Sequence, residues 1–268
     1  MLQGATGGMP SKRLIAQSFC AAAEAYDRVA AFQRRIGFEL LERIPVENGY
    51  RSVLDVGAGT GFLASEIERR NPGSHVYAVD IAEGMIRQAK SRLRGSCLIG
   101  DAEMLPVTGR SIDLLVSNLA IQWCHSLDQT FSEFARVLRH DGILGFSTFG
   151  LHTLKELRAA WASVDDQSHV NVFQTHAAIS SALVTAGLRP DFLAETEFRI
   201  SYSSPLALMR ELKGLGAHNI THDRPRHLMG RARFAQMLAQ YQALSGGGAG
   251  SIEATFHVVL GIARQSLP

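Results

Sequence analysis

The residues best suited to chemistry in this chain begin with a glycine-rich turn, Gly57-Ala58-Gly59-Thr60-Gly61, directly after the apolar segment 52–56. Glycines allow a sharp strand-to-helix turn and a close approach of backbone to a ligand. The Gly-x-Gly-x-Gly spacing differs from the Gly-x-Gly-x-x-Gly spacing of dinucleotide-binding loops. Because many nucleotide-binding proteins have such a turn, it indicates a nucleoside ligand without identifying it, and a purely structural turn remains open.

Three aspartates occupy equivalent places along the chain. Asp55 lies in the apolar segment before the glycines, Asp80 closes the segment 75–80, and Asp101 follows the segment 96–99. A carboxylate at the position of Asp80 can accept hydrogen bonds from both hydroxyls of a ribose. Asp101 can accept one from the amino group of an adenine, although a helix cap or loop role explains Asp101 alone equally well. Together, the three acids indicate a binding edge at the carboxyl ends of parallel strands.

Apolar periodicity predicts the elements that must position these residues. Short apolar runs alternate with stretches of helical spacing, and the connections have normal length. This alternation predicts a doubly wound α/β sheet, mostly parallel and buried on both faces. The predicted strands are 52–56, 75–80, 96–99, 112–117 and 143–149, and the predicted helices between them are 63–70, 82–93 and 129–138.

The flanking regions predict additions to this sheet. Residues 11–44 contain no internal proline and have apolar residues near helical spacing, which predicts a helical segment. We expect residues 1–45 to form a helical lid segment, residues 46–150 the binding core, and residues 151–268 the rest of the core with helical insertions near 151–175 and 203–249. The further predicted helices are 153–164, 176–186, 205–215 and 230–244, and the further predicted strands are 192–201 and 253–263.

Composition excludes several classes of protein. The 27 basic and 25 acidic side chains give a net charge of +2, which offers no case for nucleic-acid binding. Cys20, Cys97 and Cys124 lie far apart and form neither a disulfide framework nor a zinc pattern. No apolar run approaches the roughly 18 residues of a membrane span. We therefore expect a cytoplasmic protein without metal, membrane or nucleic-acid partner, and we expect a monomer.

In combination, the glycine-rich turn and the three acids resemble the class I S-adenosylmethionine-dependent methyltransferases, over about 51–149. The resemblance implies a Rossmann-like, seven-stranded sheet whose last strand is antiparallel. It also implies S-adenosylmethionine as methyl donor, S-adenosylhomocysteine as product and no metal. It assigns Gly57, Ala58 and Gly59 to the methionine side of the cofactor, Asp55 to orienting the loop, Asp80 to the ribose, Asp101 and Ala102 to the adenine edge, and Ile81 to the adenine face.

Further segments, most of them outside this common core, resemble the malonyl-acyl-carrier-protein O-methyltransferases, the family that opens the pimeloyl branch of biotin synthesis. This resemblance covers nearly the full chain, including both insertions. It implies an enzyme that methylates the free carboxylate of a malonyl thioester, carried by acyl carrier protein or coenzyme A. The segments are Phe19–Asp27, Gln33-Arg34, Ser117–Cys124, Ala160–Asp165, His169–Phe173 and Met209–Ala217.

The chemistry of such an acceptor sets what the site must do. A carboxylate with a pKa near ~4 is already ionised at pH 7, so it needs no general base. The enzyme must align two reactants in a dry pocket and hold one carboxylate oxygen with a cation. The candidate anchors, unranked, are Arg34, Arg210, Lys213 and His169. The resemblance adds Tyr26, Asn118, Gln122 and Trp123 to the catalytic site, although packing roles remain open for Tyr26 and Trp123.

Four arginines, Arg224, Arg226, Arg231 and Arg233, lie close together without an intervening acid. One interpretation is a solvated loop and helix start. The other is a docking patch for an acidic carrier protein, through complementary charge.

Two alternatives stay open at this stage. A quinone-ring C-methyltransferase would need a positioned base to remove a proton. The chain also resembles the methyltransferase-like assembly factor of mitochondrial complex I, through Phe149–Arg158 and Leu208-Met209. That protein acts on a protein partner, and the missing Arg-rich transit segment argues against this alternative.

Overall fold

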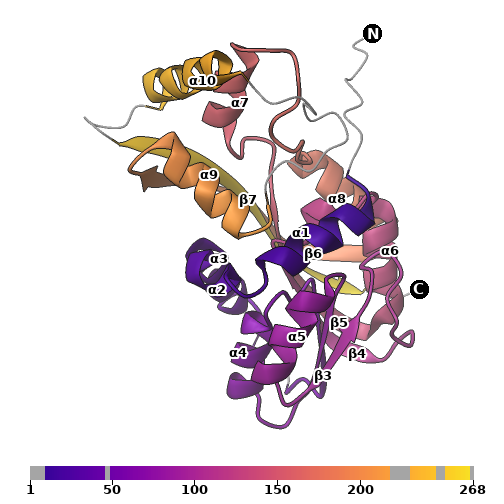
Figure 1. The fold of residues 1–268 in the computed structure, drawn as a ribbon. Coiled ribbons are helices and arrows are strands. Elements are labelled where there is room, and N and C mark those ends of the chain that lie inside the picture. Colours follow the sequence, from indigo (N-terminus) through magenta and orange to yellow (C-terminus); the bar gives the residue numbers. More distant parts are fainter. Residues whose placement is uncertain (1–9, 46–48, 218–229, 246–250, 266–268) are drawn as a thin grey trace.

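The computed structural model describes residues 10–45, 49–217, 230–245 and 251–265. Within them, seven strands form one sheet in the order β3-β2-β1-β4-β5-β7-β6 (Figure 1). All neighbouring strands pair in parallel except β7, which is antiparallel to β5 and β6. The expected doubly wound sheet with an antiparallel last strand is therefore confirmed. The strands are β1 (Ser52–Val56), β2 (His75–Asp80), β3 (Ser96–Ile99), β4 (Ile112–Asn118), β5 (Leu138–Phe149), β6 (Leu188–Tyr202) and β7 (Ile252–Gln265).

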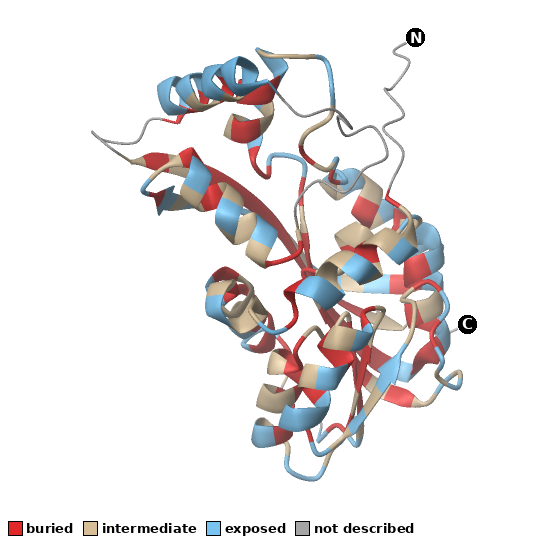
Figure 2. Cartoon of the chain, viewed as in Figure 1, coloured by how far each residue is buried: buried red, intermediate tan, exposed pale blue. Residues whose placement is uncertain are grey.

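Helices cover both faces of the sheet, and Figure 2 shows the central strands as its most continuously buried part. Neighbouring strand residues alternate between two apolar clusters. Val53 and Leu114 belong to the cluster under α3 and α4, whereas Leu54 and Leu115 belong to the cluster under α6 and α8. This alternation is the reason why the strands are apolar throughout. The helices are α1 (Lys12–Ala22), α2 (Tyr26–Val29), α3 (Ala31–Leu41), α4 (Phe62–Arg70), α5 (Glu83–Arg92), α6 (Leu127–Val137), α7 (Lys155–Ala162), α8 (His176–Thr185), α9 (Pro205–Gly214), α10 (Arg231–Leu244) and the 3-10 helix η2 (Ile121–Trp123).

The N-terminal segment is helical as expected, but it is divided into α1, α2 and α3. Ser11 caps α1, since its hydroxyl accepts a hydrogen bond from the N–H of Leu14. The backbone bends between Ala22 and Tyr26 and again at Ala30, which places α1 against α5 and α3 against β4, β5 and α4. Sequence periodicity did not reveal these bends, because no glycine or proline marks them.

The predicted start of β5 was wrong. The strand begins at Leu138 rather than Ile143, although Asp141-Gly142 reads as a turn. In the structure Ile112 pairs with Leu138 and Leu114 pairs with Ile143, so this turn signal is an irregularity inside the strand pairing. Asp141 adopts a φ of 61°, as such an irregularity requires.

The two insertions, from separate parts of the chain, meet in space. Helix α7 follows β5, helix α10 precedes β7, and they pack together at one end of the molecule (Figure 1). The Trp161 and Phe234 rings lie 6.5 Å apart, and the Gln236 side chain donates to the carbonyl oxygen of Ser163 at 3.3 Å. Residues 218–229 and 246–250, in and next to the second insertion, lie outside the described residues. No helix in the described part of the chain is long and apolar enough to cross a membrane.

Candidate cofactor and active site

The glycine-rich loop uses its N–H groups inside the protein. The N–H groups of Gly57 and Ala58 both donate to the carbonyl oxygen of Val79, at 2.8 and 3.1 Å. The N–H of Gly59 donates to a carboxylate oxygen of Asp80 at 2.9 Å. These groups are therefore not presented to a phosphate, as they are in loops that bind a dinucleotide pyrophosphate. The structure favours a nucleoside ligand without phosphates.

Gly57 is required by the packing of this loop. Its φ is 71°, and a Cβ atom built on it would lie 2.2 Å from the Cβ of Ala120. A larger residue would push the loop away from the segment that follows β4. The absence of a side chain thus keeps the carboxyl ends of β1 and β4 close together beneath the pocket.

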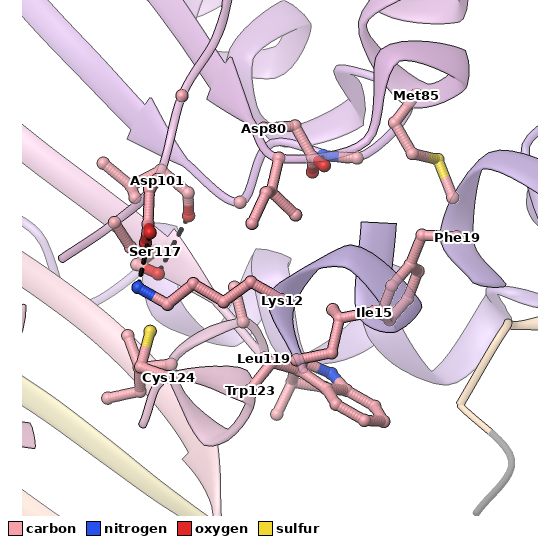
Figure 3. A pocket seen from close by; sticks show the side chains of 18 of the residues that line it. Lys12, Ile15, Phe19, Asp80, Met85, Asp101, Ser117, Leu119, Trp123 and Cys124 are labelled. Atoms are coloured by element: carbon pink, nitrogen blue, oxygen red, sulfur yellow. Dashed lines mark hydrogen bonds and ion pairs between the residues drawn. The ribbon is translucent and has the colours of Figure 1, made fainter. Parts of the chain in front are cut away.

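Asp80 ends β2 and faces the pocket (Figure 3). Besides the N–H of Gly59, it binds the N–H of Ala82 at 2.8 Å. Burial raises the pKa of Asp80, and its backbone hydrogen bonds oppose that shift. A carboxylate has about four lone-pair sites, more than these backbone N–H groups occupy, so it can still accept from the ribose that the sequence analysis assigned to it.

Asp55 lies buried beneath the loop. Its carboxylate accepts a hydrogen bond from the N–H of Ala64 in α4 at 3.1 Å. Burial and the nearby charge of Asp80 raise the pKa of Asp55 to about 7. The contact ties β1 to α4 on either side of the glycine-rich loop, which fits the expected orienting role.

Asp101 is already engaged by a residue that the sequence analysis did not single out. The ammonium of Lys12, on α1, binds Asp101 and lies 2.5 Å from Glu103 Oε2 (Figure 3). Burial lowers the pKa of Lys12, but the two carboxylates outweigh it and the net shift is upward. Helix α1 therefore closes this end of the pocket through a charged contact, and no local pattern around Lys12 signals it.

The middle of the pocket has apolar walls. Phe19 and Trp123 meet edge to face, with ring centroids 5.3 Å apart, so α1 is also held to the segment after β4. Ile81 and Ala102 also line the pocket, together with Asp80 and Asp101. The other apolar side chains that line it are those of Ile15, Met85, Leu119, Ala120, Ile121 and Cys124.

Tyr26 lies where this pocket adjoins a second, smaller one, and it lines both. Its ring passes 4.0 Å from the place where a Cβ of Gly59 would stand. Burial and the charges of Asp80 and Asp27 raise its pKa, whereas Arg34 opposes the shift. Tyr26 is therefore a neutral phenol at pH 7, able to donate a hydrogen bond.

Asn118 and Gln122 have structural partners. Asn118 Nδ2 donates to the carbonyl oxygen of Gln33 at 2.9 Å, and its Oδ1 accepts from the Ser147 hydroxyl at 2.7 Å. Gln122 donates to the main chain before η2 at 2.6 Å and accepts from the Thr148 hydroxyl at 3.2 Å. Asn118 lines both pockets, whereas Gln122 lines neither of them. These contacts support a positioning role.

The four candidate carboxylate anchors are not brought together. Arg34 lines the second pocket, where its Nη1 donates to the carbonyl oxygen of Asp27 at 2.7 Å. His169 is stacked on Trp161, with ring centroids 3.8 Å apart. Its Nε2 lies 2.8 Å from Asp165 Oδ1. The segments Ala160–Asp165 and His169–Phe173, which carry the family resemblance, therefore pack against each other. Arg210 and Lys213 are exposed on α9, and they line neither pocket.

A network around Asp27 was also not anticipated. One carboxylate oxygen of Asp27 accepts from the Thr60 hydroxyl at 2.7 Å, and the other lies 2.5 Å from Nη2 of Arg92. Hydrogen bonds to Arg92 and Thr60 hold the pKa of Asp27 below its usual value, against the effect of burial. The sequence analysis included Asp27 only as the last residue of Phe19–Asp27, one of the segments that carry the family resemblance.

The chemical character of this site suits S-adenosylmethionine. The carboxylates of Asp80 and Asp101 and several apolar side chains line the main pocket, and the adjoining pocket holds the polar groups of α2 and α3. Within the described ranges, no group of three or more His, Cys, Asp or Glu side chains could hold a metal ion.

Comparison with known proteins finds a matching family and relatives that cover most of the chain. Residues 54–146 match the family described as a methyltransferase domain. The chain is 43% identical to the malonyl-[acyl-carrier protein] O-methyltransferase of Methylococcus capsulatus, with 96% of this chain and 94% of that protein covered. It is 39% identical to the biotin biosynthesis bifunctional protein BioHC of Cellvibrio japonicus, with 86% of this chain and 46% of that protein covered.

Solved structures agree on the fold. The chain is similar to the [4+2]-cyclase SpnF with a TM-score of 0.64 and 18% identity, and the match covers 97% of this chain and 98% of that one. At this identity the likeness concerns the fold alone.

Proposed function

The chain belongs to the malonyl-[acyl-carrier protein] O-methyltransferase family, and from this premise we propose that it methylates the free carboxylate of a malonyl thioester held by an acyl carrier protein. It is an S-adenosylmethionine-dependent methyltransferase. The observation that carries the proposal is the 43% identity over 96% of the chain, which includes both helical insertions as well as the common core.

When bound, S-adenosylmethionine supplies a methyl group on a positively charged sulfur. Asp80, Asp101 and Ile81 would hold its adenosyl part, and the loop from Gly57 to Gly59 would pass beneath its methionine side. The work left to the chain is to align the acceptor and exclude water.

The carboxylate acceptor fits the groups that line the main pocket. Phe19 and Trp123 form a dry wall, and the neutral phenol of Tyr26 can donate to one carboxylate oxygen while the other attacks. No histidine lines this pocket in the described part of the chain. This favours an acceptor that is ionised at pH 7 over a quinone ring carbon, which needs a base. Because a carboxylate is already ionised at pH 7, it needs no metal to activate it, and we propose that the reaction uses none.

The product, a malonyl methyl ester on its carrier, has lost a negative charge. An apolar tunnel of a fatty-acid elongation enzyme would reject that charge, because burying an unpaired carboxylate is costly. We therefore propose that the ester enters pimeloyl and biotin synthesis. We also propose that the protein acts in the cytoplasm as a monomer, and that acyl carrier protein is preferred over coenzyme A.

The decisive experiment incubates the purified protein with S-adenosylmethionine and malonyl-acyl carrier protein and follows the carrier by mass spectrometry. We expect one methyl group per carrier, removable by an esterase, and no transfer to acetyl-acyl carrier protein, which has no free carboxylate. In parallel, the gene should restore growth without biotin to an auxotroph that lacks the methyltransferase. Failure of both assays, with S-adenosylhomocysteine binding intact, would favour the assembly-factor alternative.

A further inference from the structure

The second pocket adjoins the main one at the glycine-rich loop. The two pockets share four lining residues: Tyr26, Gly57, Gly59 and Asn118. The second pocket is completed by the N-terminal segment, through Asp27, Ala30, Gln33 and Arg34, and by Ala58, Phe62 and Leu63 near the start of α4. A ligand with its nucleoside in the main pocket can therefore extend past the loop to side chains of α3.

Gln33 presents a buried acceptor to this space. Its side-chain Oε1 is buried and has no hydrogen-bond partner within the part of the chain that the structure describes. The backbone around it is fixed, because its carbonyl oxygen accepts from Asn118 Nδ2 at 2.9 Å. A buried amide oxygen without a donor is unfavourable, so such groups in folded proteins usually have a partner. The oxygen can therefore accept a hydrogen bond from a donor that enters the second pocket.

Arg34 brings a positive charge to the same pocket. One of its guanidinium nitrogens donates to the carbonyl oxygen of Asp27 at 2.7 Å, which orients the group. Its Cζ lies 5.9 Å from the ring centroid of Phe62, across the pocket. A guanidinium has five N–H donors in a planar fork, so donors remain for a carboxylate.

A cation next to a neutral acceptor complements an α-amino acid, whose carboxylate needs the first and whose ammonium needs the second. We propose that Gln33 and Arg34 bind the amino-acid end of the methyl donor, with the ammonium on Gln33 Oε1 and the carboxylate on Arg34. This inference rests on the proposed use of S-adenosylmethionine. It assigns Arg34 to the donor rather than to the malonyl carboxylate, for which the sequence analysis had selected it.

The test compares two ligands by calorimetry. S-adenosylhomocysteine has the amino-acid end, and 5′-methylthioadenosine has the same nucleoside and thioether without it. For Arg34→Ala we expect roughly a tenfold or greater loss of affinity for S-adenosylhomocysteine, since a charged hydrogen-bonded pair is removed. The affinity for 5′-methylthioadenosine should stay unchanged. Arg35→Ala removes the same charge from the next, exposed position of α3 and should leave both affinities unchanged.

Gln33→Leu gives a second readout that a merely structural role would not produce. It replaces an unpaired buried amide by an apolar group of similar size, so the melting temperature of the free protein should hold or rise. Its affinity for S-adenosylhomocysteine should nevertheless fall several-fold, again without an effect on 5′-methylthioadenosine.

Three outcomes would overturn the inference. Equal losses on both ligands would show that the variants only displace the N-terminal segment. Unchanged binding of S-adenosylhomocysteine by both variants would remove these residues from the donor site. A higher KM of Arg34→Ala for the malonyl carrier, with normal affinity for S-adenosylhomocysteine, would show that Arg34 binds the malonyl carboxylate instead. If the wild-type protein binds neither ligand, the proposed function itself fails.

Discussion

Asp27 accepts a hydrogen bond from the hydroxyl of Thr60 across 2.7 Å, and this contact joins the N-terminal segment to the glycine-rich loop. Arg92 of α5 completes the junction, because it contacts both Asp27 and Thr60. The segment that covers the pocket is therefore attached to the loop that shapes its floor. Movement of one would be transmitted to the other.

Asp27→Ala should loosen this junction. We expect a several-fold weaker affinity for S-adenosylhomocysteine and faster amide hydrogen exchange in 24–34, because Thr60 and Arg92 lose their common partner. The effect on global stability should be small, since Asp27 and Arg92 are both more than a third exposed. Calorimetry and exchange mass spectrometry measure the two effects. Glu24→Ala, an exposed acid on the same segment, is the matched control; equal effects of the two variants would contradict the assignment.

Asp80→Ala should weaken S-adenosylhomocysteine binding by more than tenfold, because each hydrogen bond from a ribose hydroxyl to a charged group contributes about 1.5–3 kcal/mol. The variant should also be less stable, since the N–H groups of Gly59 and Ala82 lose their acceptor. Asp80→Asn keeps the size of the side chain and should recover part of the stability but less of the affinity. Unchanged affinity in folded Asp80→Ala would remove the residue from the ribose site.

Helix α1 should behave as a lid. Lys12 binds Asp101 and Glu103 across the pocket, and exit of a nucleoside requires this contact to open. In the wild-type protein, S-adenosylhomocysteine should slow hydrogen exchange across 11–34. Lys12→Ala should speed exchange of α1 in the free protein, whereas Arg13→Ala, at the exposed neighbouring position, should not. The same exchange rates with and without ligand would contradict a closing role.

The raised pKa of Asp55 predicts how stability depends on pH. The carboxyl group has a pKa of about 7 in the folded protein and 3.8 as its ordinary value, so folding favours its protonated form. This contribution is complete below pH 3.8 and is lost as the pH rises through 7. The free energy of unfolding of the wild-type protein relative to Asp55→Asn should therefore fall between pH 4 and 8. Denaturant unfolding at several pH values measures it, and a constant difference would contradict the shift.

Arg231 and Arg233, both exposed on α10, are the described part of the arginine cluster. Arg224 and Arg226 lie outside the described residues. If the cluster attracts an acidic carrier, replacing Arg231 and Arg233 by Ser should raise the KM for malonyl-acyl carrier protein several-fold and flatten its salt dependence. Malonyl-coenzyme A, which lacks a protein surface, should be affected less. Equal changes with both substrates would show that the cluster is only a solvated surface and does not bind the carrier.

Local sequence patterns are sufficient to predict the sheet and the edge at which we expect a ligand. The bounds of β1, β2 and β3 match their predicted ranges, because strand periodicity and a glycine turn are local properties of the chain. The sequence also predicts that Asp80 and Asp101 lie close together. Asp80 ends one parallel strand and Asp101 follows another, and the carboxyl ends of parallel strands lie at the same edge of a doubly wound sheet.

Which distant side chains meet at this edge depends on the fold of the whole chain. Lys12 reaches Asp101 across 89 positions of sequence, and no periodicity encodes that pairing. His169 stacks on Trp161, and Gln33 buries its amide oxygen without a partner in the described chain; residue type alone suggested neither. These outcomes depend on how the N-terminal segment and the two insertions dock on the sheet. Docking is set by long-range packing and charge, which a local pattern does not contain.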